Sequence, residues 1–281
     1  MMRSAKFFTI LGFVLLASMS LLFVGCGSDD GPTTITGSLT NPDFVVVQDQ
    51  VETIVDSTLD FVLTGMNSLS SISTDGIIIP NFYGPVFSDS DQVTIAYVGG
   101  WYVVNAVQQR SDFAFTVLDS VQFYINDEVS QNGVGADSMW YRHRWSYDVA
   151  DTTVSYTKVD GHAGFDYRGL GVNQASINGS NDVVIHDQFV SVDSTVVRQF
   201  EFSTDVNNLL VNKGPSGWDH GCPNGGTISA TATVTYTKDD AAQVVTNWNI
   251  TMTFTDGTAS ITVSSGNVVW SYTKDVCIAI N

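Results

Sequence analysis

The chain has 281 residues, with 29 Asp and Glu against 11 Lys and Arg, which gives a formal net charge of −18 at pH 7. So acidic a surface repels nucleic acid and anionic lipid headgroups, which excludes both as partners held by charge. The sequence contains no phosphate-binding glycine loop, nucleophile elbow, HExxH or EF-hand pattern, and it therefore indicates no catalytic residues, no cofactor and no metal site.

Residues 1–25 have the composition of an export signal. Arg3 and Lys6 precede an apolar run from Phe7 to Val24 that contains no charge. Removal of this segment takes away two basic residues and no acidic one, so the net charge of the remaining 256 residues becomes −20. The alternative is an uncleaved membrane anchor, because an apolar run of this length is just sufficient to span a bilayer.

The end of this signal carries a second pattern. The segment Leu22-Phe23-Val24-Gly25-Cys26 resembles the lipobox of bacterial lipoproteins, in which a small residue precedes a cysteine that is lipidated and becomes the new N-terminus. Phe23 differs from the leucine usual in that family. The resemblance implies acyl chains such as palmitate on Cys26, and each buried methylene adds about 0.8 kcal/mol of membrane affinity.

The residue after Cys26 bears on the membrane in which the anchor lies. In enterobacterial lipoproteins an Asp at this position retains the protein at the inner membrane, whereas this chain has Gly27. The resemblance therefore implies a cell-envelope protein anchored to the outer membrane. It leaves open whether the protein faces the periplasm or the cell surface.

The mature chain divides into a tether and one domain. Residues 26–40 contain the predicted lipidated cysteine and a stretch rich in Gly, Ser, Asp, Thr and Pro, which as a flexible coil reaches about 20 Å. Residues 41–281 show neither a repeat nor a further linker, so we expect a single β-rich domain.

That domain is expected to begin with an amphipathic helix from Asn41 to Met66. Polar residues recur at helical spacing at Asp49, Glu52, Thr53, Asp56 and Asp60, and apolar residues gather opposite at Phe44, Val47, Val51, Ile54, Val55, Val62 and Met66. Asn41 suits the N-cap and Gly65 suits the end of the helix. The β-favouring run from Phe44 to Val47 leaves a strand as the alternative.

Alternating polar and apolar residues predict strands through the rest of the chain. Gly99-Gly100, Asp160-Gly161 and Asp256-Gly257 are expected to be hairpin turns. The predicted strands are Gly76–Pro80, Gln92–Val98, Trp101–Val107, Asp112–Asn126, Met139–Asp148, Val154–Val159, His162–Leu170, Val183–Val192, Thr195–Thr204, Thr227–Thr237, Asn247–Thr255, Thr258–Ser264 and Val268–Ile278.

The fold class that follows is mainly β. We expect a large curved antiparallel sheet or open barrel of about ten strands, with one long N-terminal amphipathic helix along its concave face. A helix of about 25 residues spans roughly 37 Å, which matches strands of about 11 to 13 residues. The arrangement resembles the open-barrel lipoprotein carriers and related cavity proteins of the envelope in architecture alone, and fold does not fix function.

The two remaining cysteines, Cys222 and Cys277, are expected to form a disulfide, because exported proteins oxidise such pairs. Both lie at the same end of the predicted sheet. In a flat sheet their strands would be about 14 Å apart, whereas a disulfide requires Cα atoms within about 7 Å. Either the sheet curls strongly or the segment 222–226 folds back across its end.

For function, the first hypothesis is non-catalytic binding of an acyl chain or another hydrophobic ligand in an apolar concavity. The expected lining is Trp101, Tyr141, Trp145, Trp248 and Phe254, with Asp119 and Arg198 as isolated polar groups. Two alternatives remain for these residues. The aromatic residues can be ordinary core, and a bulge that turns Asp119 outward is favoured over a buried functional carboxylate.

The second hypothesis is a structural or surface-interaction lipoprotein with a filled core, which would leave the acidic outer surface to meet a protein partner. The third hypothesis is an enzyme. It ranks last, because the histidines have no motif spacing and are read as chance placements rather than metal ligands. They are His143, His162, His186 and His220.

Overall fold

The computed structural model describes residues 34–36, 92–111, 113–131, 133–152, 155–190, 195–214, 217–239 and 241–277. The predicted lipobox with Cys26, the predicted helix Asn41–Met66 and the predicted strand Gly76–Pro80 lie outside these ranges. Three residues of the predicted tether are described, and they form a short strand rather than coil.

Nearly all described residues belong to strands, so the mainly-β prediction is confirmed. The strands are β1 (Thr34–Thr36), β2 (Gln92–Val98), β3 (Trp101–Gln109), β4 (Phe113–Ile125), β5 (Glu128–Ser130), β6 (Ser138–Thr152), β7 (Ser155–Arg168), β8 (Gln174–Val190), β9 (Thr195–Gly214), β10 (Gly217–Lys238), β11 (Val244–Thr255), β12 (Thr258–Ser265) and β13 (Val268–Asp275).

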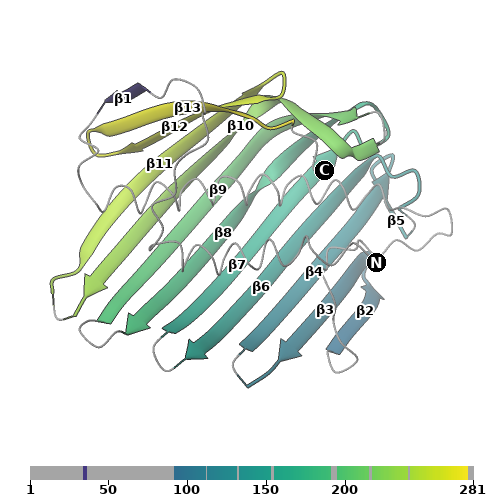
Figure 1. Ribbon diagram of the computed structural model, residues 1–281. Coiled ribbons are helices and arrows are strands. Elements are labelled where there is room, and N and C mark those ends of the chain that lie inside the picture. The colour runs from purple at the N-terminus through teal and green to yellow at the C-terminus, as the bar shows by residue number, and fades with distance from the viewer. Residues whose placement is uncertain are drawn as a thin grey trace, which may run out of the picture.

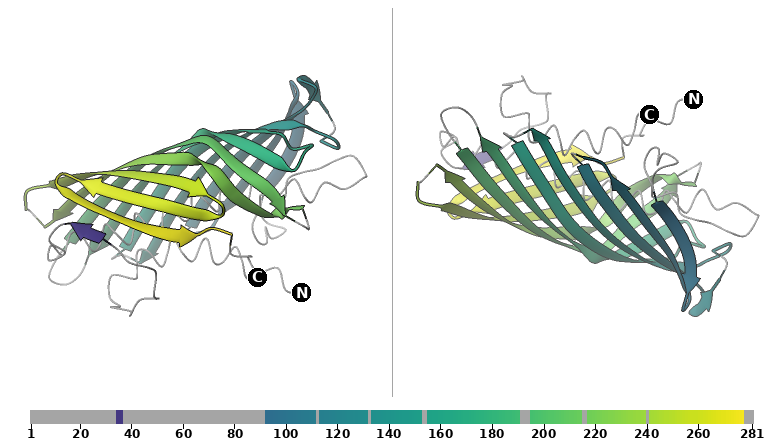
Figure 2. Two further views of the ribbon diagram at one scale, coloured as in Figure 1. Left: turned by 90° about the horizontal axis from the view of Figure 1, so that it is seen from above. Right: turned by 90° about the horizontal axis from the view of Figure 1, so that it is seen from below.

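All strands join one antiparallel sheet in the order β1-β13-β12-β11-β10-β9-β8-β7-β6-β4-β3-β2, with β5 paired to β4. The sheet is a meander, because each strand from β6 to β13 lies beside its neighbour in sequence. Figure 1 shows the long strands side by side, and Figure 2 shows the sheet bent, with β12 and β13 turned over one side. The sheet is not closed, since β2 and β1 stand at its two ends.

Two of the three predicted hairpin turns are confirmed. Gly99 and Gly100 have φ of 59° and 88°, and Asp256 and Gly257 have φ of 46° and 81°. Such left-handed pairs match the twist of the strands they join.

The third predicted turn, at Asp160-Gly161, is wrong. Strand β7 runs straight through these residues and pairs with β6 and β8 on both sides without interruption. The glycine has another purpose there: a Cβ at Gly161 would lie 2.2 Å from the indole ring of Trp145 on the neighbouring strand. Gly161 therefore admits a large side chain from β6 rather than a change of direction.

The buried hydrophobic side chains of the regularly paired strands lie on one face of the sheet, which we call the inner face, whereas buried Gln122 of β4 lies on the other. They form one continuous cluster that reaches from β4 to β13. In β11 each second residue is buried, namely Trp248, Ile250, Met252 and Phe254, while the residues between them are exposed. The predicted pattern of one apolar and one wet face is thus confirmed for this strand, and burial of the apolar face drives sheet formation.

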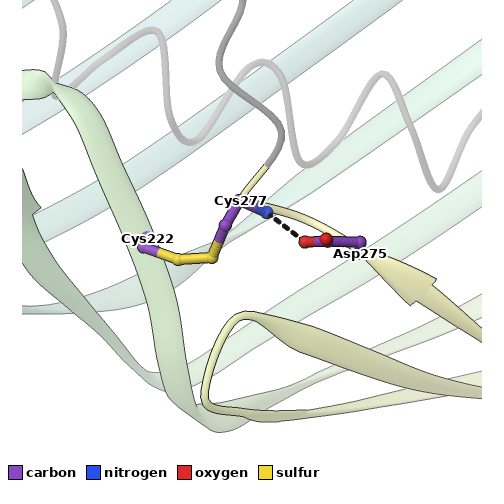
Figure 3. Close-up of a disulfide and its surroundings, with 3 residues drawn as sticks. All are labelled: Cys222, Asp275 and Cys277. Carbon is purple, nitrogen blue, oxygen red and sulfur yellow. Dashed lines mark hydrogen bonds between the residues drawn. A yellow bond between two sulfur atoms is a disulfide. The ribbon is translucent and has the colours of Figure 1, made fainter.

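The disulfide between Cys222 and Cys277 joins β10 to the end of β13, with Cα atoms 5.1 Å apart (Figure 3). The segments that carry the two cysteines both extend past the β11–β12 turn. Strand β10 pairs with β11 only from Thr227 onward, and β13 pairs with β12 only up to Asp275. The register of β10 shifts between Pro223 and Thr227, which bends the strand. The segment before Thr227 stays paired with β9, with Cys222 opposite Asn212, and it passes beside the β11–β12 turn, where the carbonyl of Pro223 accepts the N–H of Gly257.

The β11–β12 turn next to this disulfide forms hydrogen bonds with both cysteine-containing segments. Gly257 donates its N–H to the carbonyl of Pro223 at 2.9 Å, and its carbonyl accepts the N–H of Val276 at 2.9 Å. A Cβ on Gly257 would lie 2.1 Å from the sulfur of Cys277 and 3.0 Å from that of Cys222. The turn and the disulfide thus leave no room for a side chain.

We expect Gly257→Ala to lower the free energy of unfolding by about 3 kcal/mol, because it adds overpacking to the strain of a positive φ. Gly266→Ala is the matched control: Gly266 lies in the next hairpin turn with φ of 56°, and a Cβ there meets nothing within 4 Å. It should lose only about 1 kcal/mol. Urea denaturation of both variants measures the difference, and equal losses would show that the sulfur contacts do not matter.

Candidate functional site

One register row of the inner face is polar. Asp119 of β4 lies opposite His143 of β6, His143 opposite Ala163 of β7, Ala163 opposite Asn181 of β8, and Asn181 opposite Thr204 of β9. We call Asp119, His143, Asn181 and Thr204 the polar row. It crosses the middle of the sheet over four strand spacings, or about 19 Å.

The rows on both sides of the polar row are apolar or glycine. Two residues away in one direction, the cross-strand partners are Val121, Tyr141, Phe165, Gly179, Val206 and Ile228. Two residues away in the other direction they are Val117, Trp145, Gly161, Val183, Phe202 and Ala232. The polar row is therefore enclosed by hydrophobic surface.

Asp119 is the most constrained member of the row, with 1% of its surface exposed. The hydroxyl of Tyr141 donates to Asp119 Oδ1 at 3.1 Å, and His143 Nδ1 also contacts Oδ1. Because a carboxylate only accepts, the proton of this pair lies on Nδ1. The expectation that a bulge turns Asp119 outward is wrong: β4 pairs with β3 and β6 through this residue without a register shift.

Three atoms of the polar row have no hydrogen-bond partner among the described residues. They are Asp119 Oδ2, Asn181 Oδ1 and Thr204 Oγ1. Asn181 is 7% exposed and Thr204 is 1% exposed, so water does not reach them from the surface. A buried polar atom without a partner destabilises the fold by about 1 to 3 kcal/mol. Three such atoms in one row mark a place able to hold polar groups of a ligand.

Aromatic rings hold the histidine of the row in place. The ring of His143 stacks on Trp145, with centroids 4.6 Å apart and planes inclined by 28°. On its other side it stacks on Tyr141 at 6.1 Å. Trp145 in turn lies against Gly161, as described above. The imidazole is thus fixed between two rings and the carboxylate of Asp119.

A second polar group lies farther along the inner face, where Asp187 of β8 is the register partner of Arg198 of β9. Both are buried, with Arg198 Nη2 and Asp187 Oδ2 3.6 Å apart and the guanidinium 4.7 Å from the ring of Phe189. Burial raises the pKa of Asp187 against the opposing effect of Arg198, and burial lowers the pKa of Arg198. Six residues separate Asp187 from Asn181, or about 20 Å.

Of the residues expected to line a concavity, Tyr141, Trp248 and Phe254 are buried on the inner face, and Trp145 is partly buried there. The expectation that Trp101 lines the concavity is wrong. It lies on the outer face, where the guanidinium of exposed Arg142 stands 4.6 Å from its ring.

The sequence pattern missed three members of the polar row as a group. His143 and Thr204 occupy inward positions of predicted strands, whereas Asn181 precedes the predicted strand Val183–Val192, in a polar run without alternation. Their alignment depends on the register of strands far apart in the chain.

His162 does not join His143. It pairs with Asp182 at 3.1 Å and is exposed on the outer face, although it is next in sequence to Ala163, the register partner of His143. Within the described part of the chain, no group of three or more His, Cys, Asp or Glu side chains could hold a metal ion. The same described residues contain no helix long and apolar enough to cross a membrane.

No protein-family model, curated protein or solved structure matches this chain.

Proposed function

We propose that this protein binds a hydrophobic ligand along its inner face without catalysing a reaction. The observation that supports the proposal is the polar row: three buried polar atoms without partners, enclosed by two apolar rows. A site of this composition suits an amphiphile, because the hydrophobic body adds apolar contact and the polar end supplies the missing hydrogen bonds.

The proposal includes the location of the protein. Cys26 would carry the acyl anchor, and the anchor would hold the domain to the outer membrane, on its periplasmic or its surface side. The support is the resemblance of residues 22–26 to a lipobox. Attachment through acyl chains also agrees with the net charge of −20 that remains after removal of residues 1–25, which disfavours binding to anionic headgroups.

A second candidate function is a structural or surface-interaction lipoprotein with a filled core. The observation that favours it is the burial of the largest inner side chains: Trp270 is 2% exposed, Tyr141 1% and Tyr167 0%. Interiors packed to this degree leave little room for a ligand.

Native mass spectrometry distinguishes the two candidates. The chain from Gly27 would be exported behind a cleavable signal, so that it carries no acyl group, and analysed as purified from the periplasm. We expect a stoichiometric adduct that organic solvent extracts as lipid. A mass equal to that of the chain alone, together with no binding of the neutral fluorophore N-phenyl-1-naphthylamine, would contradict ligand binding and favour the filled core.

A further inference from the structure

We infer that the polar row is a head-group site that selects amphiphiles whose head group donates hydrogen bonds, through a hydroxyl or an amine, over those that end in a carboxylate. The inference rests on the proposed function, because it names the ligand class for the same inner face.

The atoms of the polar row without partners are mainly hydrogen-bond acceptors. Asp119 Oδ2 and Asn181 Oδ1 accept hydrogen bonds and cannot donate them, and Thr204 Oγ1 can do either. The proton on His143 Nδ1 is already directed at Asp119 Oδ1. The groups available to a ligand in this row are therefore mainly acceptors, which a donating head group satisfies.

Charge favours the same class of head group. Asp119 is almost completely buried, and a buried carboxylate interacts strongly with charges placed beside it. A ligand carboxylate in the row would meet a like charge, whereas an amine would meet an opposite one and a hydroxyl would donate to it. Arg198 does not reverse this preference, because its charge is opposed by Asp187 and the pair lies about 20 Å along the sheet.

The side chains between the members of the polar row are small. Between His143 and Asn181 the inner face carries only the methyl group of Ala163, and beyond Thr204 the next partner is Ala230. Small residues at these two positions leave the polar atoms uncovered by their own neighbours in the sheet. The apolar rows on both sides then offer surface to an acyl tail.

The test compares three ligands of equal chain length on the exported chain from Gly27. N-phenyl-1-naphthylamine, whose fluorescence reports apolar binding, would be displaced by 1-monopalmitoylglycerol, hexadecylamine or palmitate. We expect the glyceride or the amine to displace the fluorophore at a concentration at least tenfold below that of palmitate. Superiority of the glyceride identifies hydroxyls as the recognised donors, and superiority of the amine identifies a cation.

Substitutions within the row check where the preference arises. Asp119→Asn keeps the shape and removes the charge, so the preference over palmitate should fall at least fivefold. Thr204→Val should weaken the glyceride about threefold or more and leave palmitate unchanged. Thr251→Val is the control, because Thr251 is exposed on the outer side of β11, and it should change nothing. Circular dichroism confirms that each variant is folded.

The outcomes separate the inference from the proposed function. If the fluorophore does not bind, ligand binding itself fails. If it binds and palmitate displaces it as well as the other two ligands do, ligand binding stands and the head-group preference is wrong. A preference that persists unchanged in both Asp119→Asn and Thr204→Val would likewise overturn the assignment to this row. The comparison on the unsubstituted chain is decisive even if a variant does not fold.

Discussion

Replacement of both Cys222 and Cys277 by serine is expected to lower the free energy of unfolding by about 4 kcal/mol. The bridge joins residues 55 positions apart, and the chain between them contains β11, β12 and β13. Without the bridge the unfolded chain gains the conformations that a closed loop excludes. Urea denaturation of the oxidised chain and of the double variant measures the loss.

Reduction supplies the control for this prediction. Dithiothreitol should shift the unfolding midpoint of the original chain toward that of the double serine variant and leave the variant itself unaffected. Midpoints that coincide before reduction would mean that the unfolded chain is not constrained by this bridge. The reduced chain should also lose part of the order around the β11–β12 turn, because Gly257 bonds to residues next to both cysteines.

Arg198→Met is expected to lower the free energy of unfolding by about 3 to 5 kcal/mol, since it leaves the buried carboxylate of Asp187 without its cation. Removal of both charges in Arg198→Met/Asp187→Leu should recover most of this loss, because no uncompensated charge then remains inside. Arg144→Met is the control on the outer face, where Arg144 is exposed, and its effect should be small. Thermal and urea unfolding provide the measurements.

The same pair gives a pH dependence. Burial raises the pKa of Asp187, so the folded chain holds this proton more tightly than the unfolded chain, whose Asp pKa is about 4. The contribution of Asp187 to stability is therefore fully present below pH about 4 and is lost as pH rises through the raised pKa. The free energy of unfolding of the Asp187→Asn variant, measured against pH, should lack this loss, because the variant has no carboxyl group to titrate at this position. A loss in Arg198→Met that does not shrink at low pH would contradict the assignment.

Local sequence was sufficient for the strands that show one wet and one apolar face. In β11 the alternation from Trp248 to Phe254 predicted both the strand and its buried side, because the period of two is fixed by the pleat. The turns at Gly99-Gly100 and Asp256-Gly257 followed from the need for positive φ. Asp160-Gly161 has the same composition, but the feature that decides its conformation is the ring of Trp145 on another strand.

The candidate site was less accessible to sequence reasoning. Arg198 was expected among the polar groups of the interior, and it is buried there. Asp119 was expected to turn outward because it interrupts an apolar row. Its partners Tyr141 and His143 come more than twenty residues later, and only the register of β4 with β6 brings them together. Trp101 could not be placed from parity, because β3 carries apolar residues on both faces, and only the burial of Val104 and Ala106 identifies the inner one.

The order of strands in the sheet has a consequence for how the chain assembles. From β6 to β13 every pairing joins consecutive strands, so only short loops must close and each closure loses little chain entropy. A strand can therefore pair with its predecessor as soon as both have been synthesised, and the sheet can grow from its N-terminal side. The β1–β13 pairing is different, because its two strands come from opposite ends of the chain. That contact and the disulfide between Cys222 and Cys277 both require β13, so they form only after the last strand has paired with the sheet.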